Sequence, residues 1–241
     1  AFTTVDFCES SVNVISGVAL TGGTYAITAQ TGAATIALNT GILSGYTAGD
    51  QITIEYTTPA GACQNTSSQI VNVTPQDNAA FTTVDFCESS VNVISGVALP
   101  GGTYAITAQT GTASIDLNTG ILSGYTAGDQ ITIEYTTPAG ACQNTSSQIV
   151  NVTPQDNAAF TTVDFCESSV NVISGVALPG GTYAITAQTG TASIDLNTGI
   201  LSGYTAGDQV TIEYTTPAGA CQNTSSQIVN VTPQDNAAFT T

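Results

Sequence analysis

Hydrophobic and polar residues alternate along short stretches of this chain, and turn residues separate the stretches. The clearest case is residues 51–56, where Ile52, Ile54 and Tyr56 alternate with polar residues. A period of two places all three apolar side chains on one face of a β-strand. No stretch shows the 3.6-residue spacing of an amphipathic helix. The pattern therefore predicts an all-β fold.

The same interpretation predicts about seven short strands in the first part of the chain. In the stretch 11–14 we expect Val12 and Val14 on the buried face, alternating with Ser11 and Asn13. Short strands divided by frequent turns are typical of an antiparallel β-sandwich of immunoglobulin-like architecture. The expected strands lie at residues 2–9, 12–14, 24–29, 36–38, 42–43, 51–56 and 70–73.

The whole pattern recurs with a period of 79 residues: the text that begins at Phe2 restarts at Phe81 and Phe160. A period of this length indicates tandem domains, each with its own core. Copies two and three differ only at Ile131 and Val210. Copy one has Thr21, Ala33, Thr35 and Ala37 where copy two has Pro100, Thr112, Ser114 and Asp116. We therefore expect β-sandwich repeats at 1–77, 78–156 and 157–235, with the start of a fourth at 236–241.

A short linker, residues 74–80, joins consecutive repeats. Pro75 ends the last strand because proline has no amide proton to donate to a ladder. The linker has no glycine or serine run, so we expect it to be semi-rigid. The domains should then lie end to end as an extended rod. From the rise of about 3.3 Å per strand residue, three repeats would span roughly 110 to 130 Å.

The charge excludes several classes of function. The 241 residues include no Lys, Arg or His against 17 Asp and Glu, a net charge of −17. Nucleic acids and anionic membranes need basic residues to neutralise phosphate, so neither is an expected partner. A Ser or Cys nucleophile would lack a histidine base. The remaining catalytic candidates are the carboxylate pairs Asp6 with Glu9 and Asp50 with Glu55, and we expect no enzyme. No apolar run reaches the ~20 residues that span a bilayer.

Each repeat contains two cysteines, 55 residues apart. An even count in a small domain is typical of a disulfide in an oxidising, extracellular compartment. Because pairing within a repeat leaves no cysteine over, we predict the bonds Cys8–Cys63, Cys87–Cys142 and Cys166–Cys221. The alternative is a bond across the linker, Cys63–Cys87.

The linkers are also the candidate metal sites. Calcium binds carboxylate and carbonyl oxygens, and the acidic linkers of cadherins use it to stiffen adjacent domains. The candidate ligands are Asp77, Asn78, Asp156, Asn157, Asp235 and Asn236. The alternative is that each Asp-Asn pair is a polar turn. We expect no other cofactor.

The motifs Asp85–Glu88, Ile115–Ser123 and Val150–Pro154 occur near the start, middle and end of the second repeat. Together they resemble the tandem repeats of giant cell-surface adhesins of Bacteroidota, of which the SprB-like gliding adhesins are the best known. The resemblance implies export to the bacterial cell surface and a role as stalk or fibre. Copy one has Ala37 where the motif has Asp116, so this aspartate is not indispensable to the fold.

The sequence thus predicts a structural repeat region of an extracellular adhesin or filament. Its expected partners are neighbouring repeats of the chain, other copies in a fibre, or surface glycans. The alternative is a glycan- or protein-binding module repeated for avidity. An exposed aromatic cluster would favour that alternative, whereas Tyr25 and Tyr56 fall on the inward phase of their strands and are expected in the core.

Overall fold

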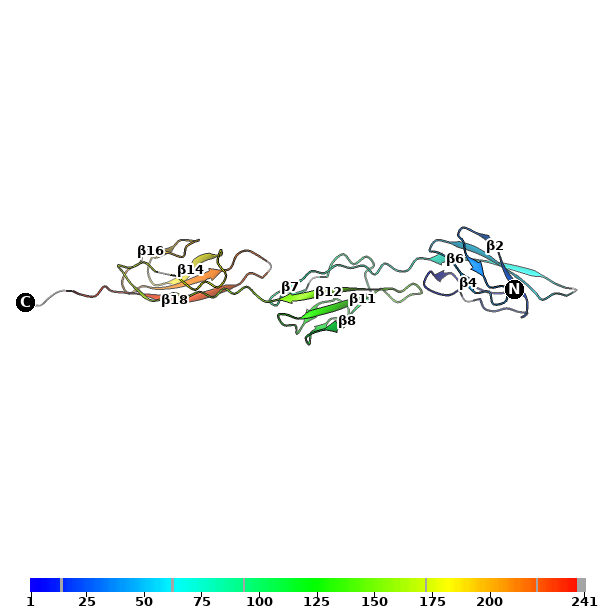
Figure 1. Ribbon diagram of the computed structural model, residues 1–241, viewed down its shortest axis with the longest axis horizontal. Helices are drawn as coiled ribbons and strands as arrows, with labels where there is room; N and C mark the ends of the chain where they lie inside the picture. The colour runs from blue at the N-terminus through cyan, green and yellow to red at the C-terminus, as the bar shows by residue number, and fades with distance from the viewer. Residues whose placement is uncertain (14, 62, 93, 172, 220, 238–241) are drawn as a thin grey trace, which may run out of the picture.

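The computed structural model describes residues 1–13, 15–61, 63–92, 94–171, 173–219 and 221–237. Every regular element in these residues is a β-strand, which confirms the all-β prediction (Figure 1). The first repeat contains β1 (Phe7–Cys8), β2 (Thr24–Gln30), β3 (Thr35–Ile36), β4 (Leu43–Ser44), β5 (Gln51–Thr57) and β6 (Thr66–Thr74). The second contains β7 (Phe86–Cys87), β8 (Thr103–Gln109), β9 (Ser114–Ile115), β10 (Leu122–Ser123), β11 (Gln130–Thr136) and β12 (Thr145–Thr153). The third contains β13 (Phe165–Cys166), β14 (Thr182–Gln188), β15 (Ser193–Ile194), β16 (Leu201–Ser202), β17 (Gln209–Thr215) and β18 (Thr224–Thr232).

Each repeat has the same two-layered topology. A four-stranded sheet has the order β1-β6-β5-β2, and the two-stranded sheet β3–β4 forms the second layer. Strands β2, β5 and β6 pair antiparallel, as predicted. The short β1 pairs parallel with β6, with Phe7 opposite Val73 and Cys8 opposite Thr74. This pairing holds the start of each repeat beside its end, next to the linker.

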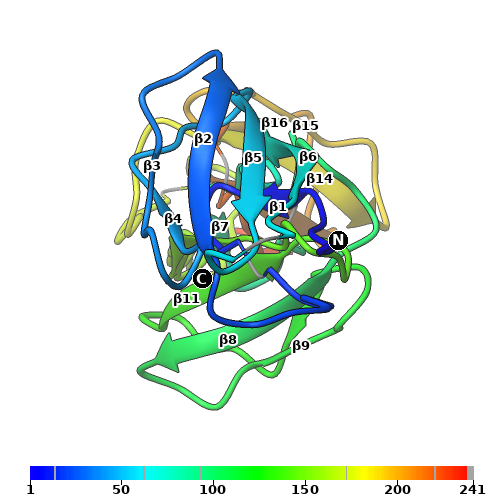
Figure 2. The same cartoon turned by 90° about the vertical axis from the view of Figure 1, so that its right-hand side faces the viewer.

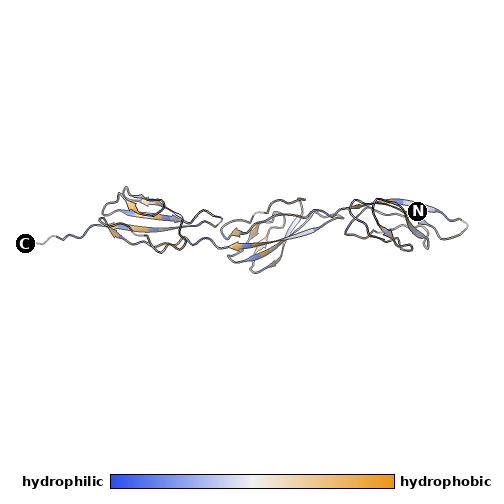
Figure 3. Cartoon of the chain, turned by 45° about the horizontal axis from the view of Figure 1, so that its top comes forward, coloured by the Kyte–Doolittle hydropathy of each residue, from blue (hydrophilic) through white to orange (hydrophobic). Residues whose placement is uncertain are grey.

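A separate hydrophobic core fills each repeat. The predicted inward residues Ile52, Ile54 and Tyr56 are 0%, 0% and 2% exposed, and Leu43 packs with them from the second layer. Burying one such side chain stabilises the fold by about 1.5–3 kcal/mol. Figure 3 shows hydrophobic and hydrophilic positions alternating along the strands of all three repeats. The period-two pattern is therefore confirmed where the alternation is longest.

The stretch 11–14 was predicted wrongly. Its described residues form no strand, and their phase is the reverse of the expected one: Val12 is 58% exposed and Asn13 is 3% exposed. The Asn13 amide donates to Thr4 Oγ1 (2.9 Å) and to the Val5 carbonyl (3.3 Å). These bonds satisfy a buried amide, which removes the cost of its burial. Val14 lies outside the described residues. The long strand expected at 2–9 is reduced to β1 and an isolated bridge between Thr3 and Ser16.

The turn before β2 depends on close backbone approach at Gly23. A Cβ there would lie 2.0 Å from the carbonyl oxygen of Thr57, so no other residue fits. The Gly23 amide donates to the hydroxyl of Tyr56 (2.9 Å), which itself donates to the Leu20 carbonyl. The Tyr25 ring lies 4.8 Å from the Tyr56 ring, centroid to centroid. Both tyrosines belong to the core, as predicted.

The repeats follow one another along the long axis of the chain (Figure 1). Figure 2, seen along this axis, shows β8 at an angle to β2, so the second repeat is turned about the axis relative to the first. The connection between β11 and β12 reaches back toward the first repeat. This connection builds the junction between repeats.

Candidate functional site: the junction between repeats

The hairpin connection between β11 and β12, which we call the clasp, comprises residues 137–144. Thr137 and Asn144 close it: the Thr137 amide donates to the Asn144 carbonyl and the Asn144 amide donates to Thr137 Oγ1, both at 2.9 Å. The Gln143 side chain donates to the Thr137 carbonyl (3.0 Å). Threonine and asparagine form such local bonds readily, because their short side chains reach nearby backbone groups. The clasp is thus an ordered loop.

The clasp binds the linker through Asp77. Thr137 Oγ1 donates to Asp77 Oδ2 and the Asn144 side-chain amide donates to the Asp77 carbonyl, both at 3.0 Å. The Asp77 amide in turn donates to the Cys142 carbonyl (2.9 Å). Thr137 is 1% exposed, so its bond to the carboxylate is shielded from water. A hydrogen bond to a charged acceptor is roughly twice as strong as a neutral one. The linker carboxylate therefore fixes one repeat to the next.

The second junction has the same geometry. Thr216 Oγ1 donates to Asp156 Oδ2 (3.1 Å) and the Asn223 side chain donates to the Asp156 carbonyl (3.0 Å). The Asp156 amide donates to the Cys221 carbonyl (2.9 Å). Two independent junctions with one set of contacts indicate that the contacts belong to the repeat itself.

Disulfides cross both junctions: Cys8 bonds Cys142, and Cys87 bonds Cys221, with Cα atoms 5.2 and 5.3 Å apart. The predicted pairs Cys8–Cys63, Cys87–Cys142 and Cys166–Cys221 are therefore wrong, and the alternative Cys63–Cys87 does not occur either. Cys63 and Cys166 are free thiols.

The physical reason is that the two cysteines of a repeat lie at its opposite ends. The β1–β6 pairing holds Cys8 beside Thr74, at the end that faces the next repeat. Cys63 lies in the first repeat's equivalent of the clasp, which points away from that end. Each bond closes a sequence separation of 134 residues, which stabilises by about 5 kcal/mol in the chain-entropy account.

The candidate catalytic carboxylates have structural partners instead. Asp6 Oδ1 accepts from the Asn72 amide (2.8 Å), and Glu9 Oε1 accepts from the Gln76 amide (3.1 Å). Asp50 Oδ2 accepts from the Thr47 amide (2.8 Å). Glu55 lies on the outer face of β5, opposite Ser68. Asp6, Glu9 and Asp50 therefore hold the ends of strands and the linker through backbone amides.

The linker residues proposed as calcium ligands already accept hydrogen bonds at both junctions. Asp77 is bound by the clasp, and Asn78 Oδ1 accepts from the Ala80 amide (3.1 Å). Asp156 and Asn157 repeat this arrangement. No group of three or more metal-ligating side chains lies together in the part of the chain that the structure describes. Calcium binding at the linkers stays a prediction, and a bound ion would have to compete with Thr137 for Asp77.

A second acidic site occurs in the turn between β9 and β10. Asp116 Oδ1 accepts from the Thr119 amide (2.7 Å), the Thr119 hydroxyl (2.8 Å) and the Asn118 amide (3.0 Å). These bonds stabilise the carboxylate and hold the pKa of Asp116 below its ordinary value. The equivalent bonds lower the pKa of Asp195. The Asn230 amide does the same to the pKa of Asp164.

No protein-family model matches the sequence, and no curated protein does. Solved structures that are similar include three EC domains of mouse protocadherin-24, at 12% identity and TM-score 0.29, covering 95% of this chain and 97% of that one. A three-domain immunoglobulin fragment of titin matches at 12% identity and TM-score 0.39, covering 97% and 96%. A SusE-like surface-located polysaccharide-binding protein of Bacteroides thetaiotaomicron matches at 14% identity and TM-score 0.35, covering 95% of this chain and 45% of that one.

The described residues contain no helix long and apolar enough to cross a membrane.

Proposed function

We propose that this chain is a structural repeat region of an extracellular adhesin or filament, in which it acts as a stalk or fibre building block. The observation that carries the proposal is the junction. Each repeat is joined to the next by the backbone, by a disulfide and by the hydrogen bonds of Asp77 or Asp156. Domains joined by a flexible linker alone would move independently, so three kinds of connection at one junction favour a stiff array.

The two disulfides also support an extracellular location for the chain. Disulfides persist outside the cytosol, where no reducing pool breaks them. The resemblance to SprB-like adhesins of Bacteroidota supports the bacterial cell surface as the place. A charge of −17 with no basic residue favours solubility and opposes folding back of one repeat on another.

The alternative of a glycan-binding module has less support. Sugar binding by stacking requires an exposed ring. None of the Tyr and Phe residues that the structure describes is exposed, and their rings pack against one another inside the repeats. Tyr46 is only partly buried, but its hydroxyl donates a hydrogen bond to the Ser11 carbonyl (2.5 Å).

Small-angle X-ray scattering of the oxidised chain tests the proposal. We expect an extended particle of roughly 110 to 130 Å, from the strand rise. A variant with Cys8→Ser and Cys87→Ser should keep folded repeats and show a broader distribution of lengths. A compact, nearly spherical particle, both without and with calcium, would overturn the stalk proposal. Extension only in the presence of calcium would assign the linker oxygens to the metal and keep the stalk.

A further inference from the structure

Two stretches of the second repeat run side by side from one junction to the next. Residues 81–87 follow β12 in the same direction. Toward the first junction, the Gln148 side chain donates to the Phe81 carbonyl (3.5 Å). At the other end, Cys87 lies opposite Thr153. The two stretches therefore span the repeat together, from the junction with the first repeat to the junction with the third.

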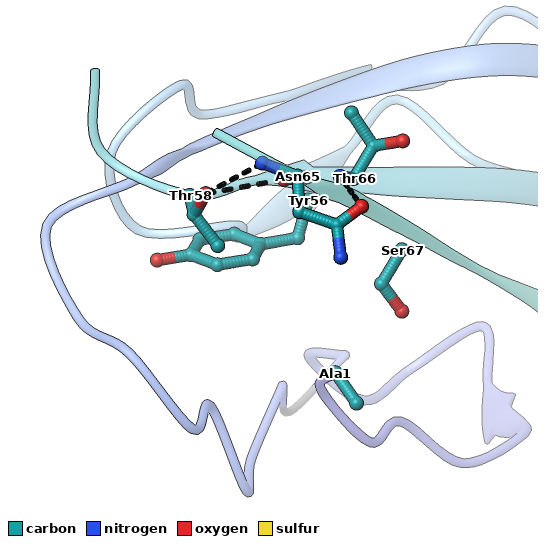
Figure 4. Close-up of a pocket in the computed structure, with 6 residues that line it drawn as sticks. All are labelled: Ala1, Tyr56, Thr58, Asn65, Thr66 and Ser67. Atoms are coloured by element: carbon teal, nitrogen blue, oxygen red, sulfur yellow. Dashed lines mark hydrogen bonds between the residues drawn. The ribbon is translucent and has the colours of Figure 1, made fainter. Parts of the chain in front are cut away.

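The first repeat contains the same parallel pair. Ala1 lies beside Thr66 and Ser67, where β6 begins, and the three residues line one small pocket (Figure 4). At the far end of the repeat, Cys8 lies opposite Thr74, where β6 ends. In the third repeat β13 and β18 are again parallel. The pair is therefore a property of the repeat.

In the second repeat, both members of the pair are covalently tied to both neighbouring repeats. Residues 81–87 begin at the first linker and end at the disulfide that joins Cys87 to the third repeat. Strand β12 begins just after Cys142, which is bonded to the first repeat, and continues into the second linker. Each member is thus held by the backbone at one end and by a disulfide at the other.

These connections form two covalent tracks along the chain. The first track consists of residues 1–8, joined by the Cys8–Cys142 bond to residues 142–166. The second track consists of residues 63–87, joined by the Cys87–Cys221 bond to residues 221–237. In the second repeat, residues 88–141 belong to neither track, although they include the core side chains of β8 and β11.

We propose that the two tracks carry tension from repeat to repeat, so that pulling on the chain does not unfold the second repeat. A strand rises about 3.3 Å per residue, close to the limit of about 3.3–3.6 Å for a fully extended chain, so the tracks have little slack. Residues 88–141 then lie beside the tracks and bear no load. This inference deepens the proposed stalk function and rests on it for its use, since a stalk must transmit tension.

Without the disulfides, the same tension would act differently on the repeat. The first linker would pull residues 81–87 toward the first repeat, and the second linker would pull β12 toward the third. Hydrogen bonds alone would resist this sliding, among them the bond from the Asn151 amide to Asp85 Oδ1 (2.8 Å). The disulfides hold each stretch at both ends, so tension does not slide one past the other.

Pulling on single molecules tests the proposal. Cys166 is a partly exposed free thiol, and in the Cys63→Ser variant it is the only cysteine outside the two disulfides. One handle is attached to it through a thioether and the other to the start of the chain, so that the tension acts on the first track. This track has about 30 residues and extends to at most about 110 Å. We expect the tether to stretch to this limit without an unfolding step.

Handles at the two ends of the chain provide the comparison, because these ends lie on different tracks. Tension must then pass from Cys142 to Cys87 through the residues between them. We expect the second repeat to unfold in this geometry. The two cysteines are 55 residues apart, so the disulfides should limit the unfolded segment to roughly 180–200 Å.

Two matched variants show which bond protects the repeat, each made with Cys63→Ser and pulled through Cys166. Replacing both Cys87 and Cys221 by serine keeps the first track, so the tether should still show no step. Replacing both Cys8 and Cys142 breaks the first track. This change should release up to 134 residues, roughly 440–480 Å of chain. Reducing the Cys63→Ser protein on the instrument should give the same release without a further substitution, because the thioether handle survives reduction.

Two results would overturn the proposal. One is an unfolding step in the oxidised tether between the start of the chain and Cys166. The other is an equal maximum extension of that tether with and without the bond between Cys8 and Cys142. Neither result would change the extended particle expected in solution scattering, so a failure of the tracks is distinguishable from a failure of the stalk.

Discussion

The six cysteines form two sets of three with identical neighbours in sequence, Cys8, Cys87 and Cys166 in one and Cys63, Cys142 and Cys221 in the other, but they have three different environments. Cys8 and Cys87 are fully buried in disulfides, Cys142 and Cys221 lie in clasps, and Cys63 and Cys166 are free. Short peptides around equivalent cysteines are identical, so a peptide mass alone does not identify the pair. Counting thiols in variants does.

We predict two free thiols per chain when the unreduced, monomeric protein is denatured and titrated with a thiol reagent. Cys63→Ser and Cys166→Ser should each lower the count to one, because neither residue takes part in a bond. The double variant should have none. Bonds within the repeats would instead give no free thiol in the unsubstituted chain, and a count of zero would contradict the structure.

The turn that contains Asp116 shows how one side chain distinguishes the first repeat from the others. Ala37 takes this position, and the Gly41 amide still donates to its carbonyl (2.8 Å), so the turn forms without the carboxylate. Asp116 adds its three accepted hydrogen bonds to the same backbone.

We predict that Asp116→Ala with Asp195→Ala lowers the urea midpoint of unfolding at pH 7. Because the pKa of each carboxyl is lowered on folding, its contribution is complete above the ordinary pKa of about 4 and is lost as the pH falls through the lowered pKa. The difference from the unsubstituted chain should therefore shrink as the pH falls below that ordinary value. Ala37→Asp should have the opposite effect at pH 7. A difference that is the same at pH 7 and at acidic pH would show that the charge of these two carboxylates plays no part.

At the scale of elements, the strands were predictable where one alternation lasts long enough to identify the buried face. Strand β5 is such a case, with every second residue fully buried. The stretch around Asn13 is too short to identify the buried face. Asn13 is buried because its amide has hydrogen-bond partners, yet from the sequence a polar residue at this position is expected on the exposed face of a strand. The disulfides were not predictable from spacing, because they depend on which way the hairpin β5–β6 points relative to β1.

The linker was identified as a functional site, but its partners, Thr137 and Asn144, come from a loop in which no charged residue or unusual motif marks them.

The hydrogen bonds between the clasp and Asp77 hold the linker close to Cys142. We predict that Asp77→Ala lowers the effective concentration of Cys8 for Cys142 about tenfold, since Thr137 and Asn144 lose their acceptor or its geometry. The measurement is the disulfide equilibrium in a glutathione buffer, with the other four cysteines changed to serine. Asp235→Ala is the matched control, because no clasp binds that residue, and it should leave the equilibrium unchanged. Equal effects of the two substitutions would show that Asp77 does not contribute through the clasp.

For the whole molecule, the two disulfides overlap along the chain. One joins residues 8 and 142 and the other joins 87 and 221, so every backbone position between Cys8 and Cys221 lies inside at least one closed loop. A single backbone cut in this range leaves the chain covalently continuous. With bonds inside each repeat, a cut in either linker would separate the repeats. Linkers and loop tips are where proteases cut most readily, so the observed pairing keeps the chain joined at the points most exposed to cleavage.

A unique cleavage site tests this continuity. The chain has no Lys or Arg, so trypsin has no site in it, and Gln76→Arg creates one in the first linker. Gln76 is exposed and only its backbone amide is bound, to Glu9, so the substitution should not disturb the fold. After denaturation without reduction, with free thiols blocked, we predict that trypsin adds one water to the mass without separating the pieces. Reduction should then release residues 1–76 and 77–241. The same variant with Cys8→Ser should separate without reduction, because it lacks the bond to Cys142. Separation of the Gln76→Arg protein before reduction would show that no covalent bond crosses the junction.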